Sequence, residues 1–561
     1  PVLKIFSIIF QVIIFGTLTG SIVSICSIGF VLGVKNISNF RLTNSSCLFE
    51  LSGYCFSATP LVFLALAAVA IILVKKSLNI SRYHGPADVI LSAHSPTSEL
   101  DIKTGFLSTF SAFISASGGA SVGQYGPLVH LGGTIGNLIN RRTKGLLSKD
   151  IFIGCGVAAA ISAGFNSPIG GIIFAHEAIL RHFSFRAIAP IAVSSVVSST
   201  LTTYFFPSGI LFQNTDSNIS IIPSVSMSLL LGPICAIIAV IFMSSLLRLQ
   251  KNVAKISSSE LIRILYAVIL CGVLGGFIPE ILGLGGETIN GILNNQYSVD
   301  FLIIILVIKL LVTIVCLSMG FFGGVFSPAL VLGASVGGIF TYIGNSIGIG
   351  MLGSSLILAG MAALSASVIG APIATIVIIF ELTRSYDLAF VSIICVAGSC
   401  LVSSFYFGHS FFDKQLISRN FKIARGRTEI LLSEISVGNL LDKNKYLTVS
   451  VNIKRLELLN LFEKTGFTEA YFVDNGGKLV GKTKVNSVLS DSSVKLIQDA
   501  HPLYIEKSSN ISDAIIKISN FVGESVPVVD SNKVLKGVVT ESDLFLEYLK
   551  VQDQISEIEK D

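Results

Sequence analysis

Charged residues are scarce in this chain. Only 13% of its 561 residues are charged, whereas 52% are hydrophobic, and the mean hydropathy is +0.78. Three long stretches, Ile5–Val34, Thr104–Asn140 and Leu310–Phe380, contain no Asp, Glu, Lys or Arg. This composition excludes an ordinary soluble protein and predicts a polytopic membrane protein. Gly and Pro interrupt the third stretch throughout, which predicts broken helices that line a pathway.

Tryptophan is absent, and the nine cysteines form no Cys-x-x-Cys motif or His/Cys cluster. The sequence therefore predicts no metal site. Most cysteines lie in apolar stretches, where they serve as small hydrophobic residues. Cys47 and Cys55 share the polar loop between the first two apolar segments. If that loop is extracytoplasmic it can carry a disulfide, but two free thiols fit the sequence equally well.

Basic residues are clustered rather than abundant, because the net charge is only +5. The clusters flank apolar segments, so the positive-inside rule predicts that these ends of the segments lie on the cytoplasmic side. Their position at membrane edges also argues against a role in binding nucleic acid. They are Lys75, Lys76 and Arg82; Arg141, Arg142 and Lys144; and Lys414, Arg419, Lys422, Arg425 and Arg427.

The first apolar run is too long for a signal peptide and predicts a retained helix. The chain begins at Pro1, so we expect native residues before it. Because no eukaryotic targeting signal is visible, we expect a multi-pass protein of a bacterial inner membrane.

A short glycine-framed motif occurs twice. Gly123-Gln124-Tyr125-Gly126-Pro127 is followed 201 positions later by Gly324-Val325-Phe326-Ser327-Pro328. Glycine permits a tight turn, and proline is tolerated at the first position of a helix. The free N–H groups of that first helical turn, with the helix dipole behind them, form an anion site. Two such turns in register predict a pathway for anions.

A second set of residues repeats at an offset of 204. Pro168 and Glu177 recur with the same spacing as Pro372 and Glu381. The membrane domain, residues 1–425, is therefore predicted to contain two related repeats, at about 60–250 and 260–420. In transporters built this way the ligand site lies at the repeat interface, near the middle of the membrane.

Three charged residues lie within apolar segments of the two repeats. Intramembrane carboxylates are functional candidates, but the symmetric placement of Glu177 and Glu381 favours a structural role, such as capping or pairing with a basic residue. Lys309 is a candidate partner for a buried acceptor.

After about residue 430 the composition changes, and charged residues alternate with short β-branched runs. Two segments, 433–490 and 497–550, each predict the order strand, helix, strand, strand, helix. The tail is thus expected to be a duplicated α/β domain.

Four sequence blocks resemble the signatures of CLC chloride channels and transporters, and the tail resembles the paired CBS domains of many members. The blocks are Ser117–Pro127, Phe165–Pro168, Gly324–Pro328 and Gly370–Pro372 with Glu381. The resemblance implies an all-α polytopic membrane domain of inverted repeats with broken helices, and homodimers with one pore per subunit. Helix N-termini converge there on dehydrated anions.

The chain departs from the family at two carboxylates. The family's gating glutamate, which carries protons in exchangers, corresponds to Tyr125, and a phenol stays neutral near neutral pH. The second proton-relay glutamate corresponds to Ala178, next to Glu177. The resemblance therefore implies that stoichiometric proton exchange lacks its usual carriers.

The remaining pathway residues are assigned by the same resemblance. His84 and Gly85 match the family's serine-containing turn, and Phe412 matches its inner-gate tyrosine. Val325 and Phe326 are expected to act through backbone N–H groups. His84 is either a core histidine or an N–H donor to the anion, which would make conduction pH-sensitive. Tyr125 either packs in the vacated space or lines the pore, and in the pore it is either a hydroxyl donor or a plug.

In the tail, Thr540 and Asp543 match the nucleotide motif of the second CBS repeat, whereas Thr483–Asn486 in the first repeat lacks the acid. An adenine nucleotide is therefore a candidate ligand, and a purely dimerising tail is the alternative.

The sequence as a whole predicts a homodimeric, passive channel for chloride or a similar monovalent anion, not an enzyme, with no required cofactor and with cytoplasmic CBS domains. Its alternatives are a proton-coupled exchanger with an atypical proton path, and a largely closed nucleotide-responsive sensor.

Overall fold

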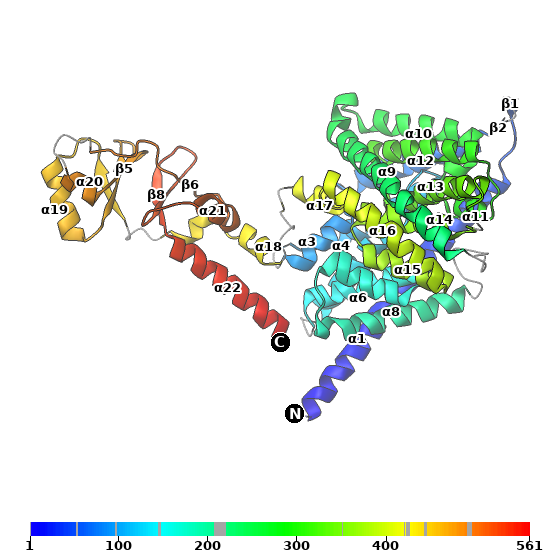
Figure 1. Ribbon diagram of the computed structural model, residues 1–561, viewed down its shortest axis with the longest axis horizontal. Coiled ribbons are helices and arrows are strands. Elements are labelled where there is room, and N and C mark those ends of the chain that lie inside the picture. Colours follow the sequence, from blue (N-terminus) through cyan, green and yellow to red (C-terminus); the bar gives the residue numbers. More distant parts are fainter. Residues whose placement is uncertain are drawn as a thin grey trace. The chain divides into compact units, whose positions relative to one another are not determined.

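The computed structural model describes residues 2–51, 54–95, 98–143, 147–206, 220–349, 352–419, 421, 427–441, 446–490 and 496–560. Internal contacts divide the chain into two units, Pro1–Ser418 and Arg419–Asp561 (Figure 1). Each unit is described by itself.

The first unit is helical apart from one short hairpin, as predicted. Its elements in order are α1 (Val2–Thr43), β1 (Phe49–Leu51), β2 (Tyr54–Phe56), α2 (Thr59–Ser77), α3 (Pro86–His94), α4 (Ile102–Gly118), α5 (Tyr125–Arg142), α6 (Lys149–Phe165), α7 (Pro168–Phe174), the π-helix η1 (Ala175–Leu180), α8 (Phe185–Phe205), α9 (Ile221–Ile256), α10 (Glu260–Phe277), the 3₁₀ turn η2 (Pro279–Ile281), α11 (Gly286–Leu293), α12 (Val299–Met319), α13 (Phe326–Ser346), α14 (Ser355–Ile369), α15 (Pro372–Thr383), α16 (Tyr386–Tyr406) and α17 (Phe411–Ile417).

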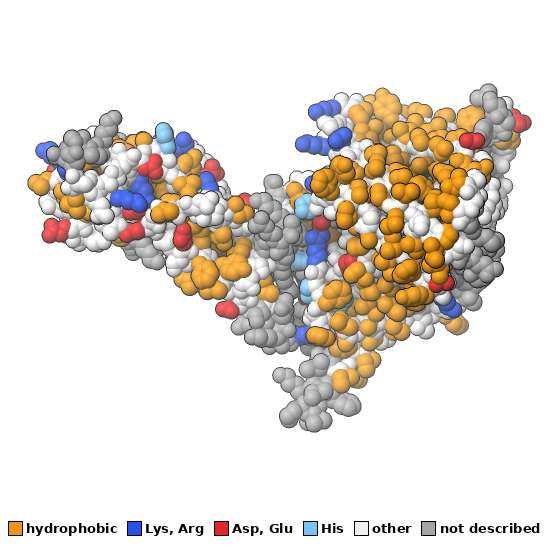
Figure 2. Space-filling model, in the orientation of Figure 1, with side chains coloured by type: hydrophobic (Ala, Val, Ile, Leu, Met, Phe, Trp, Pro, Cys, Tyr) orange, Lys and Arg blue, Asp and Glu red, His pale blue; other side chains and the backbone are white. Residues whose placement is uncertain are grey.

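This unit is an integral membrane domain. In the described part of the chain, eight helical segments are long and apolar enough to cross a bilayer, and three shorter apolar segments accompany them. Figure 2 shows hydrophobic side chains over most of the visible face of the unit, with most of its visible Lys and Arg side chains along one edge. Broken helices alternate with full-length ones, as the Gly and Pro interruptions predict.

The two halves of the unit pack in the same way. α1 lies against α6 and α8, and α9 lies against α14 and α16 in the equivalent arrangement. The halves therefore run from α1 to α8 and from α9 to α16, which differs from the expected bounds of about 60–250 and 260–420. Motif spacing fixes the offset between two repeats but not where either one begins.

Glu177 and Glu381 each cap the N-terminus of a helix in the opposite half of the membrane unit. Glu177 accepts hydrogen bonds from the backbone N–H groups of Ile373 (3.0 Å) and Ala374 (2.7 Å), in the first turn of α15. Glu381 does the same for Ile169 (3.0 Å) and Gly170 (2.8 Å) in α7, and also accepts from the Ser167 hydroxyl. A carboxylate at a helix N-terminus satisfies free N–H groups and complements the helix dipole. The prediction of a structural capping role is confirmed.

Glu381→Ala is expected to lower the free energy of unfolding of the membrane unit by about 1–3 kcal/mol, because three charge-assisted hydrogen bonds to α7 are lost. Glu99→Gln is the control, because Glu99 forms an exposed ion pair with Arg141 that contributes little. Thermal unfolding in detergent measures both, and equal shifts in the two variants would contradict the capping role.

Lys309 is fully buried and donates hydrogen bonds to two carbonyl groups near η2. Its Nζ lies 2.8 Å from the oxygen of Ile281 and 3.0 Å from that of Gly283. The predicted role, a partner for a buried acceptor, is confirmed. The ammonium fixes this segment against α12.

The second unit contains two three-stranded sheets of the same topology. β3 (Leu447–Ser450), β4 (Glu469–Val473) and β5 (Leu479–Lys484) form one sheet; β6 (Ile505–Glu506), β7 (Val526–Val529) and β8 (Leu535–Val539) form the other. In each sheet the first pair is parallel and the second is antiparallel. The accompanying helical elements are α18 (Arg427–Glu434), η3 (Val437–Leu440), α19 (Arg455–Thr465), α20 (Val485–Ser490), α21 (Ile511–Ile518) and α22 (Glu541–Lys560). The predicted duplication is present in the fold.

The strand register corrects one part of the sequence comparison. Thr483 pairs with Ala470, just as Val539 pairs with Val526 in the second repeat. Lys484 therefore occupies the place of Thr540, so the assignment of Thr483–Asn486 to that position is wrong by one residue. The sequence comparison is misled because Thr483, a hydroxyl residue like Thr540, lies directly before Lys484, the true equivalent of Thr540.

Candidate functional site

The two glycine-framed turns are joined to each other. The N–H of Gly123 donates to the oxygen of Gly324 (2.8 Å), and the N–H of Gly324 donates back to Gly123 (2.7 Å), as an antiparallel bridge. The bridge brings the first turns of α5 and α13 together. Only glycine fits, because a Cβ on Gly123 would lie 2.8 Å from the oxygen of Gly324. The first turns of the two helices, whose N–H groups have no intrahelical partner, thus meet at one point.

A small cavity lies where these helices begin. It surrounds five of the residues that the sequence predicts for the anion pathway, namely Tyr125, Gly126, Val325, Phe326 and Phe412. Pro86, Val129, Ile161, Phe174 and Ile369 complete the lining. Its volume is about 10 Å³, which is about the space of one water molecule. The lining is apolar except for the Tyr125 hydroxyl and the backbone.

Tyr125 is held by two aromatic rings. It stacks on Phe165, with ring centroids 3.8 Å apart, and meets the edge of Phe326 at 5.2 Å. Its side chain is buried, and a Cβ on Gly164 would lie 2.8 Å from the ring. The ring therefore packs against Phe165 and Phe326 and also lines the first cavity. The sequence analysis did not identify Phe165 as its partner, although Phe165 opens one of the signature blocks.

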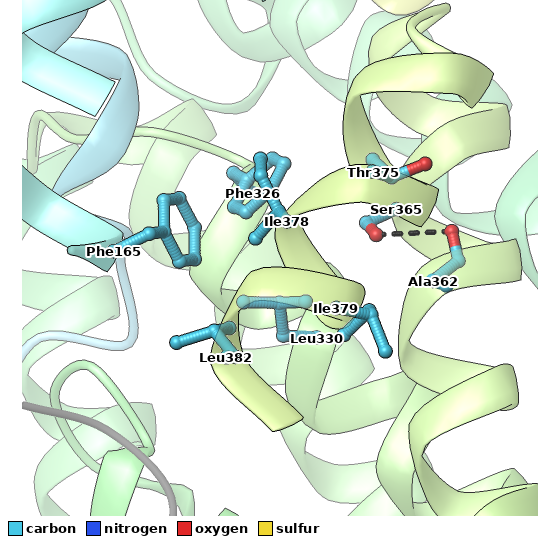
Figure 3. A pocket seen from close by; sticks show the side chains of 9 residues that line it. All are labelled: Phe165, Phe326, Leu330, Ala362, Ser365, Thr375, Ile378, Ile379 and Leu382. Atoms are coloured by element: carbon cyan, nitrogen blue, oxygen red, sulfur yellow. Dashed lines mark hydrogen bonds between the residues drawn. The ribbon is translucent and has the colours of Figure 1, made fainter. Parts of the chain in front are cut away.

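A second small cavity, also of about 10 Å³, adjoins these rings (Figure 3). Phe165 and Phe326 face it from one side, and Ser365 and Thr375 from the other. Both hydroxyls donate to backbone oxygens of their own helices. Phe326 lines both cavities, Phe165 lines the second and Tyr125 the first, and each cavity has room for about one water molecule.

His84 and Gly85 precede α3 and lie outside the lining of the first cavity. The His84 backbone N–H donates to the Ser108 hydroxyl at 3.0 Å, and Gly85 is the N-cap of α3. The His84 ring faces the His130 ring, with centroids 5.8 Å apart. The residue of α3 that reaches the cavity is Pro86, immediately after this turn.

The remaining side of the first cavity is set by α17. Ser410 and Asp413 form a reciprocal capping box at its N-terminus, and Phe412 lies within that first turn. An ion pair between Asp413 and Arg181 ties α17 to the end of η1, the π-helix that contains Ala178. This ion pair thus joins α17, which contains Phe412, to η1, which contains Ala178, and both residues depart from the family pattern.

In the second unit, Thr540 and Asp543 bond to each other. The Thr540 hydroxyl donates to the Asp543 carboxylate at 2.7 Å, and the Asp543 N–H donates to the Thr540 hydroxyl at 3.1 Å. This is a cap of α22. The pair therefore has a structural function in the described state, and a nucleotide would have to replace or extend these bonds.

The chain resembles known proteins over most of its length. The family described as voltage gated chloride channel matches residues 65–404, and a CBS domain matches residues 494–550. The H(+)/Cl(−) exchange transporter ClcA of Salmonella schwarzengrund (strain CVM19633) is 27% identical over 428 residues, covering 72% of this chain and 86% of the relative.

Two solved structures share the fold. A slow cyanobacterial Cl−/H+ antiporter has a TM-score of 0.63 at 19% identity, and the match covers 73% of this chain and 98% of the antiporter. A eukaryotic CLC transporter has a TM-score of 0.64 at 16% identity, covering 95% of this chain and 98% of the transporter. With the family match spanning more than half of the residues, the chain belongs to the voltage gated chloride channel family.

Proposed function

We propose that this protein is a homodimeric, passive channel for chloride or a similar monovalent anion, in a bacterial inner membrane with its CBS domains in the cytoplasm. One observation carries the proposal: the cavity at the paired helix N-termini has no carboxylate among its described lining residues, and it is lined by Tyr125, which by the resemblance replaces the family's gating glutamate. A protein that exchanges protons for anions needs a titratable group in the pathway that takes up and releases a proton. This lining offers the anion backbone N–H groups but offers the proton no carrier.

The geometry supports selection of anions by the backbone. A dehydrated anion loses its hydration shell and needs replacement donors. The first turns of α5 and α13 provide N–H groups with the positive ends of two helix dipoles behind them. A cation would find no carboxylate or amide side chain among the described lining to compensate for its lost hydration shell. Selectivity in this proposal is therefore electrostatic and comes from the backbone.

Flux measurements on purified protein in liposomes test the proposal. We expect chloride flux that continues unchanged when the proton gradient is clamped, because no proton transfer accompanies it. Proton uptake driven uphill by a chloride gradient would contradict a passive channel.

A second candidate function is proton-coupled exchange, which the relative and one neighbour carry in their names as H+/Cl− exchangers. In this chain the half-buried His84 and the buried His130, whose ring centroids lie 5.8 Å apart, would be candidate proton carriers. The same proton assay separates the two functions.

A nucleotide-responsive sensor, the third candidate, predicts no flux in the native chain and none in Tyr125→Ala.

A further inference from the structure

Arg41, near the end of α1, is a buried cation whose charge is only partly satisfied. The residue is 3% exposed, and its Nη2 donates to the Ser38 hydroxyl at 3.2 Å. Its Nε and Nη1 atoms have no hydrogen-bond partner among the described residues. A guanidinium stays charged under physiological conditions, and burying such a charge without a partner is costly. The position therefore calls for an acceptor or an anion.

The surroundings of Arg41 contain a second cation and no paired acid. The guanidinium packs against Gly119, where any side chain would collide with it, and it also lies near Gly283. The carbonyl of Gly283 already accepts a hydrogen bond from Lys309. The Glu287 carboxylate attracts the Arg41 guanidinium electrostatically, but Arg41 forms no ion pair in the described part of the chain. Arg41 is therefore a buried cation without a paired acid among the described residues.

Arg41 lines a cavity of about 200 Å³. The lining contains three serine hydroxyls and no Asp or Glu among its described members; they are Arg41, Leu42, Ser45, Ser46, Cys47, Cys55, Ser57, Pro60, Gly275, Gly276, Pro279 and Leu282. A buried guanidinium with unpartnered N–H groups, in the lining of an acid-free cavity, is the composition of an anion site. The volume holds a small anion together with water but not a nucleotide.

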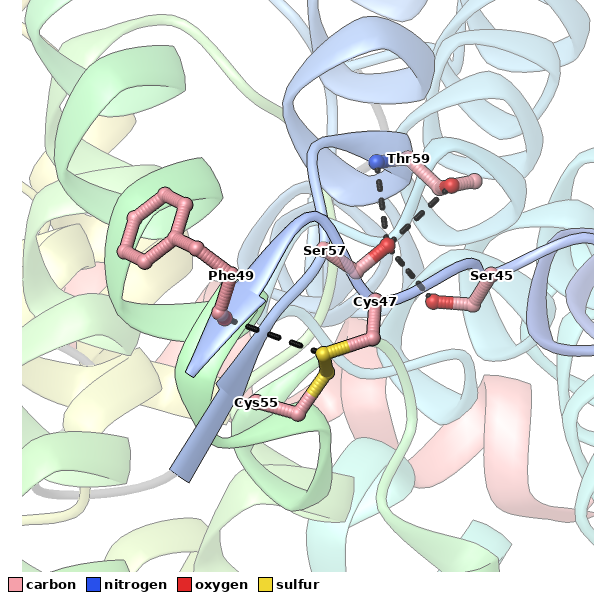
Figure 4. The surroundings of a disulfide bond; sticks show 6 residues. All are labelled: Ser45, Cys47, Phe49, Cys55, Ser57 and Thr59. Atoms are coloured by element: carbon pink, nitrogen blue, oxygen red, sulfur yellow. Dashed lines mark hydrogen bonds between the residues drawn. A yellow bond between two sulfur atoms is a disulfide. The ribbon is translucent and has the colours of Figure 1, made fainter. Parts of the chain in front are cut away.

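A disulfide forms the rim of this cavity. Cys47 and Cys55 are bonded, which decides between the two alternatives left open by the sequence (Figure 4). Behind the bond, the Ser45 hydroxyl donates to Ser57 at 2.7 Å, and Ser57 donates to Thr59 (Figure 4). The disulfide and these hydrogen bonds thus cross-link the described residues between α1 and α2.

The cavity opens toward the side of the membrane opposite the basic clusters. Lys75 and Lys76 lie in the last turn of α2, and the cavity lies where α2 begins. Because basic clusters mark the cytoplasmic side, the start of α2 is extracytoplasmic, where disulfides persist.

We propose that this cavity is a binding site for a small inorganic anion of the halide class, held by the Arg41 guanidinium with the help of the Ser46 hydroxyl. The site is distinct from the cavity at Tyr125, because the two share no lining residue. It is linked to that region through the chain, since Gly119, on which Arg41 packs, lies four residues before Gly123, where the turn begins. Occupancy from the extracytoplasmic side would stabilise the start of that turn.

Bromide is the probe for this site, used with the full chain. Crystals of the native protein grown in bromide are expected to show an anomalous peak beside the Arg41 guanidinium, within the cavity that Arg41 lines. In solution, replacing gluconate by bromide is expected to raise the melting temperature of the native protein. Part of that rise should be lost in Arg41→Gln and kept in Arg263→Gln, a control in which a partly exposed arginine outside the cavity is changed.

The outcomes separate this site from the conducting pathway. Tyr125→Ala changes only the pathway, so the bromide peak at Arg41 should persist in that variant. A cavity that contains only water in bromide-grown crystals would overturn the proposal, as would a bromide response of Arg41→Gln equal to that of the native chain. If Arg41→Gln does not fold, the native crystals decide alone. A peak at Arg41 in a protein that carries no flux would leave this site standing and refute the proposed channel.

Discussion

Tyr125→Ala is expected to increase anion flux about ten- to a hundredfold. The substitution removes a ring that stacks on Phe165 at 3.8 Å and contacts the edge of Phe326 at 5.2 Å. Each such pair contributes about 0.5–1.5 kcal/mol, and each 1.4 kcal/mol removed from a barrier is about a factor of ten in rate. Because the present cavity has room for about one water molecule, an anion has to displace this ring to pass.

Tyr125→Phe is the matched control. It keeps the ring and its stacking but removes the hydroxyl, so flux close to that of the native chain is expected. Chloride efflux from liposomes with matched protein content measures both variants. A flux that falls in both would show that the hydroxyl coordinates the anion, which contradicts the ring acting as a plug.

Lys482→Ala is expected to destabilise the second unit by about 3–5 kcal/mol, because it leaves a buried carboxylate without its partner. Lys482 and Glu469 are 7% and 5% exposed, and their charged groups lie 2.5 Å apart. The Lys482 ammonium also donates to the oxygen of Ser525 at 3.1 Å. The Tyr471 hydroxyl donates to the same oxygen at 2.7 Å, and burial raises the pKa of that phenol. This cluster joins the two repeats, since Ser525 belongs to the second.

Lys484→Ala is the control, because Lys484 lies 3.9 Å from the same carboxylate but its side chain is 52% exposed. An exposed pair contributes at most about 1 kcal/mol. Hydrogen exchange of the β4 and β7 amides in the full chain measures the local free energy of opening. Equal changes in the two variants would show that the buried pair does not hold the repeats together.

The sequence predicts the meeting of the two turns well, and the reason is physical. Gly123 and Gly324 have to be glycines because each approaches the backbone of the other turn, so the motif itself records the contact. The symmetric glutamates are likewise predictable as caps. What spacing does not reveal is that each glutamate caps the other repeat, because a cap separated by about 200 residues leaves no local signal.

Other features of the site depend on tertiary contacts alone. Phe165 is apolar in an apolar helix, so nothing in its surroundings distinguishes a ring that holds Tyr125 from an ordinary packing residue. Arg41 follows an apolar run, where a basic residue is typical of a membrane edge, and only the folded loop of Cys47 and Cys55 encloses it. In the tail, pairing register rather than residue type shows that Lys484 stands in the place of Thr540.

The exchange of caps between the halves has a consequence for biosynthesis. The amide groups of Ile169 and Gly170 leave the ribosome 211 or 212 residues before the glutamate that satisfies them. At about 5–20 residues per second, the interval is on the order of 10–40 s. During that time the first half is already in the bilayer with an incomplete helix start, so translation of the second half becomes the step that completes the first.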